Sequence, residues 1–159
     1  MNDRYLSIYL NDHLAGSTAG RQVAARALEQ NREGPLGDFL RVLVGEIEED
    51  RESLIRLMGL LGIRRDPVKV GAVWAAERIG RVIKFNGHLL SYSPLSRLEE
   101  LEFLSLGVEG KRLMWRALEV LAETDDRLKG FDFATLIKRA EVQRDELERH
   151  RLAAAAAAS

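Results

Sequence analysis

The chain of 159 residues contains no cysteine, and only 3 of its residues are proline. Without cysteine it can form no disulfide, iron–sulfur cluster or thiolate zinc site, and it has no thiol nucleophile. It also lacks an excess of either charge, since 24 basic side chains face 25 acidic ones. Proteins that bind nucleic acid usually carry a basic excess on one face, so we expect no nucleic-acid partner.

Long hydrophobic runs are absent as well. The longest of them, at 57–63 and 70–76, are far shorter than the ~20 residues of a membrane-spanning helix. The first residues, Met1 to Tyr5, do not begin a secretory signal peptide. We therefore expect a cytoplasmic protein that has no membrane partner.

The chain does have enough apolar residues for one hydrophobic core. Hydrophobic residues make up 46% of it, and a chain of about 150 residues buries roughly two-thirds of its unfolded surface on folding. We expect a single helical-bundle domain over 1–152. A poly-alanine tail over 153–159 should prolong the last helix or fray from it.

Proline and glycine divide the chain at 34–35, 66–67, 93–94 and 129–130. Between these breaks apolar residues recur every three or four positions, which is typical of amphipathic helices. The sequence predicts an all-α fold with five long helices, over 3–31, 36–62, 67–89, 94–123 and 131–155. Residues that suit their N-cap positions are Asn2 or Asp3, Asp66, Ser93 and Asp132. Because the connections are short, consecutive helices should be antiparallel neighbours. Ser96, three residues after Ser93, is not the Glu that completes a capping box.

Two polar residues lie where the apolar stripes predict burial. His13 falls at the centre of the stripe on the first helix, and Asp50 fills a gap in the apolar ladder between Ile47 and Leu54 on the second. Glu46 lies one turn before Asp50. At a rise of about 1.5 Å per residue, antiparallel packing brings His13 and Asp50 to within about one turn of the same level.

The same count brings Glu109 of the fourth helix and Arg144 of the fifth to this level, and the resulting polar layer has two interpretations. In the first, His13 bonds Asp50 and Arg144 bonds Asp50 or Glu109, so that a buried network fixes the helix register. In the second, His13, Glu46, Asp50 and Glu109 bind a divalent cation or a pair of iron or manganese ions, which accept carboxylate and imidazole ligands. Arg144 at the same level argues against a cation.

This arrangement resembles the ferritin-like helical bundles. The second and fourth helices should run in the same direction, because the helix over 67–89 returns the chain between them, and in ferritin-like proteins a long crossover has that role. The resemblance implies a bundle of the first, second, fourth and fifth helices. The family's metal site takes Glu from two helices and Glu-x-x-His from two others. Here none of His13, His88 and His150 follows a Glu at that spacing, so no ferroxidase or oxygenase activity is implied.

The fourth helix is apolar on two opposite faces. The face expected to meet the core consists of Leu95, Phe103, Leu106, Leu113, Ala117 and Leu121. The second face consists of Leu101, Leu104, Val108 and Trp115. Since a monomer of this size does not readily cover both, we expect a homo-oligomer formed through the second face. The function that the sequence favours is a structural or interaction protein without an enzymatic signature.

Two glycines suggest a further possibility. Gly16 and Gly20 follow His13 on the same face and remove side-chain volume beside it. The space admits a partner helix, a water molecule or a small apolar ligand. No glycine-rich loop precedes a helix as in a phosphate-binding site, and no order of Ser, His and Asp suggests acyl transfer. Self-association, metal binding and binding of a small apolar ligand are therefore the functions to compare.

Overall fold

In the computed structural model, residues 2–66 and 92–158 are described, and these form helices without any strand. The helices are α1 (Asp3–Gln30), α2 (Gly34–Leu60), α4 (Pro94–Ala122) and α5 (Phe133–Ala157), with a short 3-10 helix, η1 (Asp126–Leu128), before α5. The predicted all-α class is confirmed. The helix predicted over 67–89 lies outside the described residues, so the predicted capping role of Asp66 stays a prediction. No helix of the described part is both long enough and apolar enough to cross a membrane.

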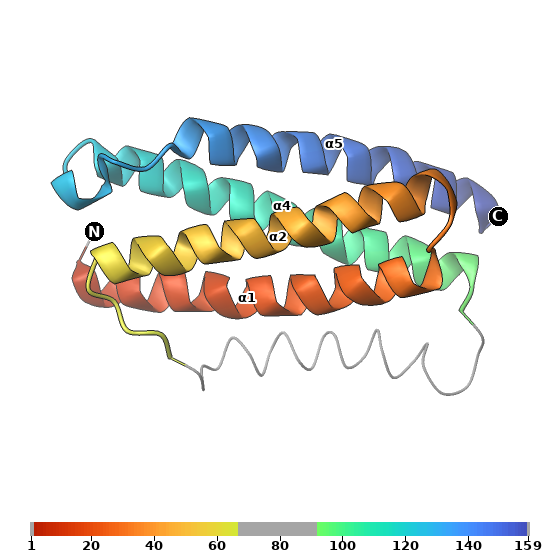
Figure 1. Ribbon diagram of the computed structural model, residues 1–159, viewed down its shortest axis with the longest axis horizontal. Coiled ribbons are helices and arrows are strands. Elements are labelled where there is room, and N and C mark those ends of the chain that lie inside the picture. Colours follow the sequence, from red (N-terminus) through yellow and green to blue (C-terminus); the bar gives the residue numbers. More distant parts are fainter. Residues whose placement is uncertain (1, 67–91, 159) are drawn as a thin grey trace.

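The long helices lie side by side along one axis (Figure 1). α1 packs against α2 and α4, and α5 packs against α4 and, more sparsely, against α2. Each of these neighbouring pairs is antiparallel, whereas α2 and α4 run in the same direction, as the sequence predicts (Figure 1). The order around the bundle is therefore α1, α2, α5 and α4, and each helix turns one face toward a shared interior.

The buried apolar side chains form two clusters along this interior. One is built around Leu43 and Leu104, and the other around Trp115. On α2, Asp50 lies between residues of the first cluster and residues of the second, and Lys111 does so on α4. A polar layer thus divides the core at about mid-length.

The helix ends confirm three of the predicted N-caps. The side chains of Asn2, Ser93 and Asp132 accept hydrogen bonds from the first backbone N–H groups of α1, α4 and α5. A capping box forms at Ser93 although the sequence predicts none, because the Ser96 hydroxyl accepts from the Ser93 N–H (3.4 Å) while Ser93 Oγ accepts from the Ser96 N–H (3.2 Å). At the other end of the chain, α5 continues into the alanine-rich tail, and Ala154 is buried.

The segment that follows α2 is fastened to α1 by one buried amide. Gly62 takes a positive φ of 69° after the last turn of α2, a conformation that costs little only for glycine. The chain then passes Asn11, whose Nδ2 donates to the carbonyl oxygen of Arg64 (3.1 Å) and whose Oδ1 accepts from the N–H of Asp66 (2.8 Å). These bonds fix the height of α1 relative to α2, two residues from His13.

The two faces of α4 are the reverse of what the sequence predicts. Leu101, Leu104, Val108 and Trp115, expected on an oligomer surface, are buried in the core. The exposed apolar side chains of α4 are instead Leu95, Leu106, Leu113 and Val120. The physical reason is that a helix with two apolar faces has no single amphipathic direction, so periodicity places the faces opposite one another without saying which one is inside.

We predict that Gly37→Ala destabilises the fold. Gly37 is buried in the first turns of α2, where an added methyl group would overlap the carbonyl oxygen of Asn31 and lie 2.6 Å from that of Arg32. Overpacking of this kind costs about 1 to 3 kcal/mol. The matched control is Gly45→Ala, at an exposed position of the same helix with open space, which should stabilise by about 0.5 to 1 kcal/mol. Urea unfolding measures both, and equal effects of the two substitutions would contradict the packing argument.

Candidate functional site

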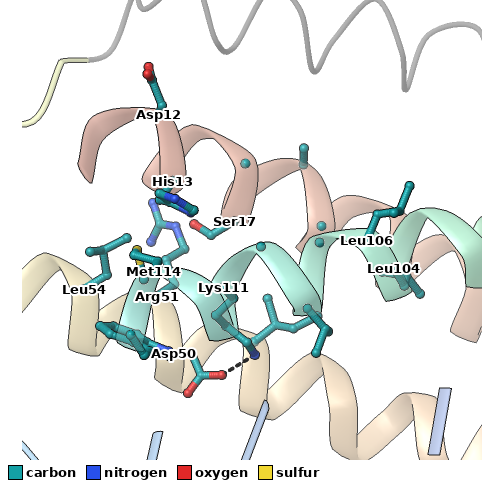
Figure 2. Close-up of a pocket in the computed structure, with 18 of the residues that line it drawn as sticks. Asp12, His13, Ser17, Asp50, Arg51, Leu54, Leu104, Leu106, Lys111 and Met114 are labelled. Atoms are coloured by element: carbon teal, nitrogen blue, oxygen red, sulfur yellow. Dashed lines mark hydrogen bonds and ion pairs between the residues drawn. The ribbon is translucent and has the colours of Figure 1, made fainter. Parts of the chain in front are cut away.

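A cavity of about 450 Å³ opens between α1, α2 and α4 (Figure 2). Its wall is mostly apolar. The large apolar side chains that line it are Tyr9, Ile47, Leu54, Phe103, Leu104, Leu106, Val108, Met114 and Trp115. Its polar lining consists of Asp12, His13, Ser17, Asp50, Arg51 and Lys111. A concave, largely apolar space with few polar groups, lying between the helices of a bundle, is typical of small-molecule sites.

Glycines make room for the cavity on two facing helices. Gly16 and Gly20 line it from α1, and Gly107 and Gly110 line it from α4. A Cβ atom added to any of these four would meet no atom within 4 Å. The space therefore lies beside Gly16 and Gly20, where the sequence indicates missing side-chain volume, and α4 contributes a second pair of small residues to it.

The floor of the cavity is formed by a lysine whose charge is already engaged. The ammonium group of Lys111 donates to Asp50 Oδ2 and to Gln143 Oε1, each at 2.5 Å. Arg139 donates to the other oxygen of Asp50 (3.1 Å), and Gln143 Nε2 donates to Glu46 Oε2 (2.7 Å). Asp50 is only 3% exposed, and both of its oxygens accept from a cation. The network thus joins α2, α4 and α5 through the centre of the bundle.

Burial shifts the ionisation of both members of this pair. It raises the pKa of the Asp50 carboxyl, although Lys111 and Arg139 act in the opposite direction. It lowers the pKa of the Lys111 ammonium, although Asp50 and Glu46 favour the charged form. Removing two charges from water costs several kcal/mol per ion, and the mutual attraction offsets this only while both partners are present.

The structure brings together two of the four residues predicted to bind a metal. Asp50 and Glu46 share the network around Gln143. His13 lines the cavity with Asp50, and its ring makes an edge contact with Tyr9 at a centroid distance of 4.6 Å. The fourth, Glu109, belongs to a separate ion-pair group. In the described part of the chain, no three His, Asp or Glu side chains are grouped as a metal site would require.

The hydrogen-bonded network predicted for this layer forms only in part. Glu109 accepts from Arg112 at 2.7 and 2.9 Å and pairs with Arg144 at 3.5 Å, so the predicted contact of Glu109 with Arg144 is confirmed. The predicted bond between His13 and Asp50 is replaced by the bonds of Asp50 to Lys111 and Arg139. The partner of Asp50 on α4 is therefore Lys111, which lies two residues after Glu109.

Lys111 had a recognisable signal in the sequence. On α4 the ladder Leu104, Val108 and Trp115 lacks an apolar residue at its next expected position, and Lys111 stands there. The gap between Ile47 and Leu54 identifies Asp50 by the same pattern. Because the sequence predicts this face of α4 on the surface, the gap there does not predict that Lys111 is buried.

Two polar groups of the cavity have capacity left for hydrogen bonding. Burial lowers the pKa of His13, so its imidazole is neutral near pH 7, and neither ring nitrogen has a hydrogen bond within the described residues. Arg51 Nη1 lies 3.5 Å from Glu48 Oε1, a long contact, and Glu48 pairs more closely with Arg21 (2.7 Å). In Figure 2 the side chain of Arg51 extends from α2 toward α1, where His13 lies.

A second buried carboxylate, which the sequence analysis did not single out, lies near the other end of the bundle. Glu100 on α4 accepts from the Tyr92 hydroxyl (3.0 Å) and lies 3.2 Å from Arg26 Nε on α1. Asn31 Nδ2 donates to the same hydroxyl (2.7 Å), and burial raises the pKa of Tyr92 to about 12. This group ties the end of α1 to the start of α4.

Comparison with known proteins assigns neither a family nor a function to the chain. No protein-family model, no curated protein and no solved structure matches this chain. The ferritin-like resemblance consequently stays a prediction from the helix arrangement, and the function has to be argued from the site itself.

We predict that Asp50→Asn destabilises the fold by about 3 to 5 kcal/mol, because it leaves the Lys111 ammonium buried without its counter-ion. In the double variant Asp50→Leu with Lys111→Met the loss should be much smaller, since both charges are removed. The control is Glu109→Gln, which breaks a solvated pair and should cost less than about 1 kcal/mol. Denaturant unfolding of the three variants measures these losses in the free energy of unfolding. A loss in the double variant as large as the loss in Asp50→Asn would contradict the stabilising role of the Lys111 and Asp50 pair.

Proposed function

We propose that this domain binds a small apolar molecule in the cavity between α1, α2 and α4. The observation that carries the proposal is the cavity itself, which has about 450 Å³ of space and a wall of apolar side chains and glycines. The apolar side chains that line an open cavity of this size stay in contact with water, which is unfavourable. A ligand that fills the cavity would remove this apolar surface from water.

The ionic network supports this proposal because it keeps the cavity floor rigid and apolar. Lys111 presents its methylene chain to the cavity while its ammonium group is held by Asp50 and Gln143. Arg139 adds a second contact to Asp50. The floor is thereby fixed from α2 and α5, and a ligand would meet a preformed surface, which lowers the entropic cost of binding.

In this proposal the chain has a five-helix, ferritin-like architecture, with the helix over 67–89 as the crossover. The common direction of α2 and α4 supports it. The metal-binding alternative through His13, Glu46, Asp50 and Glu109, with iron or manganese, has less support. Two cationic side chains, Lys111 and Arg139, already form ion pairs with Asp50.

Self-association is the second candidate function, because α4 presents an apolar stripe away from the core. Leu106, Leu113 and Val120 recur at a spacing of seven residues and are 69%, 52% and 62% exposed. Two helices pack along a seam when apolar residues recur every 3.5 residues, and a repeat of seven supplies every second position of such a seam. The homo-oligomer expected from the sequence would therefore use this stripe, in place of the buried face around Leu104.

We predict that filling the cavity abolishes binding of an apolar probe. The double variant Gly20→Leu with Gly110→Leu places two side chains into open space within the cavity. The neutral fluorophore N-phenyl-1-naphthylamine should bind the unmodified protein, and its affinity should fall at least about tenfold in the filled variant.

The matched control is Gly45→Leu with Gly59→Leu, two exposed positions on α2 that also have open space and do not line the cavity. Circular dichroism and cooperative unfolding establish that each variant is folded. If the unmodified protein does not take up the probe, or if the filled variant takes it up equally well, the proposed function is wrong.

For the second candidate, we predict a dimer at micromolar concentration that Leu106→Glu with Leu113→Glu converts to a monomer, because each substitution places a charge in the seam. Sedimentation equilibrium gives the mass. Val42→Glu on α2, where the side chain is similarly exposed, serves as the control and should leave the dimer intact. A monomeric unmodified protein at that concentration would rule out this candidate.

A further inference from the structure

We infer that the ligand is an amphiphile with a single acid group, whose carboxylate is held by Arg51 beside His13 while its apolar chain lies between the glycines. The inference rests on the proposed function, since it concerns the same cavity. It follows from the distribution of charge around the wall, which is uneven along the axis of the bundle.

The positive charge of Arg51 is only partly neutralised. Glu48 is its ion-pair partner at 3.5 Å, and the same carboxylate lies 2.7 Å from Arg21 on α1. One negative charge is thus shared by two positive ones, so the Glu48 carboxylate does not neutralise both guanidinium groups. A guanidinium group presents paired N–H donors that match the two oxygens of a carboxylate.

His13 offers a second donor at the same end. Its neutral ring carries one N–H group, and the edge contact with Tyr9 holds the ring in place. The carboxylate of Asp12, the neighbouring residue, points away from the cavity (Figure 2). Its charge favours the protonated form of the His13 ring, but its oxygens are turned from the side on which an anion would meet His13 and Arg51.

The remaining lining excludes a second charged group on the ligand. Lys111 has its ammonium committed to Asp50 and Gln143, so only its methylene chain is available. From His13 to Gly20 along α1, a distance of about 10 Å by helical rise, the facing wall on α4 is formed by apolar residues and glycines. That length suits a straight hydrocarbon chain of medium size, and one acid group at its end matches the guanidinium group of Arg51, whose own ion pair with Glu48 is long.

The test compares decanoate with decanol by isothermal titration calorimetry, below the concentrations at which either aggregates. Decanoate should bind the unmodified protein at least about tenfold more tightly, as expected for hydrogen bonds to a charged group. Arg51→Met should remove that advantage and change the affinity for decanol less than about twofold. Arg51→Lys, which keeps the charge but not the paired donors, should lie between the two.

Arg41→Met is the matched control, because Arg41 also lies on α2 and also pairs with a carboxylate three residues earlier, but does not line the cavity. It should leave both affinities unchanged. If neither compound binds the unmodified protein, the proposed function itself fails. If decanol binds as tightly as decanoate, or Arg51→Met weakens both equally, the cavity is a binding site and the inferred acid recognition is wrong.

Discussion

The buried ion pair between Lys111 and Asp50 is the interaction on which the rest of the structure depends. It lies where two apolar clusters meet, and it is the point at which α2, α4 and α5 are joined by polar contacts. A buried pair of this kind contributes little net stability, but the loss of one partner is expensive. Its effect is therefore to select one register of the helices, since any sliding of α4 against α2 would separate the charges.

α1 takes no part in that network, and this explains where the cavity lies. Three helices are drawn together by the ion pair and its neighbours, while α1 approaches α4 with glycines on both sides. His13, the residue of α1 at this level, contacts Tyr9 and the cavity and forms no bond to the charged cluster. The centre of the bundle is thus tightly specified on one side and open on the other.

The sequence predicts the long helices of the described residues, three N-caps, the burial of Asp50 and the missing volume beside Gly16 and Gly20. These follow from local spacing and from the chemistry of helix ends, which depend on few distant contacts. It does not predict the partner of Asp50. Glu109 and Lys111 lie two residues apart, and therefore on nearly opposite sides of α4. If the wrong face of α4 is predicted to be buried, Glu109 is placed in the polar layer, and Lys111 is placed on the surface. Helical periodicity gives the relative angles of side chains, and only tertiary packing determines which side faces inward.

Leu106 belongs both to the wall of the cavity and to the exposed stripe of α4. A second molecule packed on the stripe would cover this leucine and with it part of the cavity mouth, and a ligand that contacts Leu106 would alter the surface offered to the second molecule. The two binding events would then be thermodynamically coupled. Because such coupling is reciprocal, the factor by which a ligand changed the dimer affinity would equal the factor by which dimer formation changed the ligand affinity.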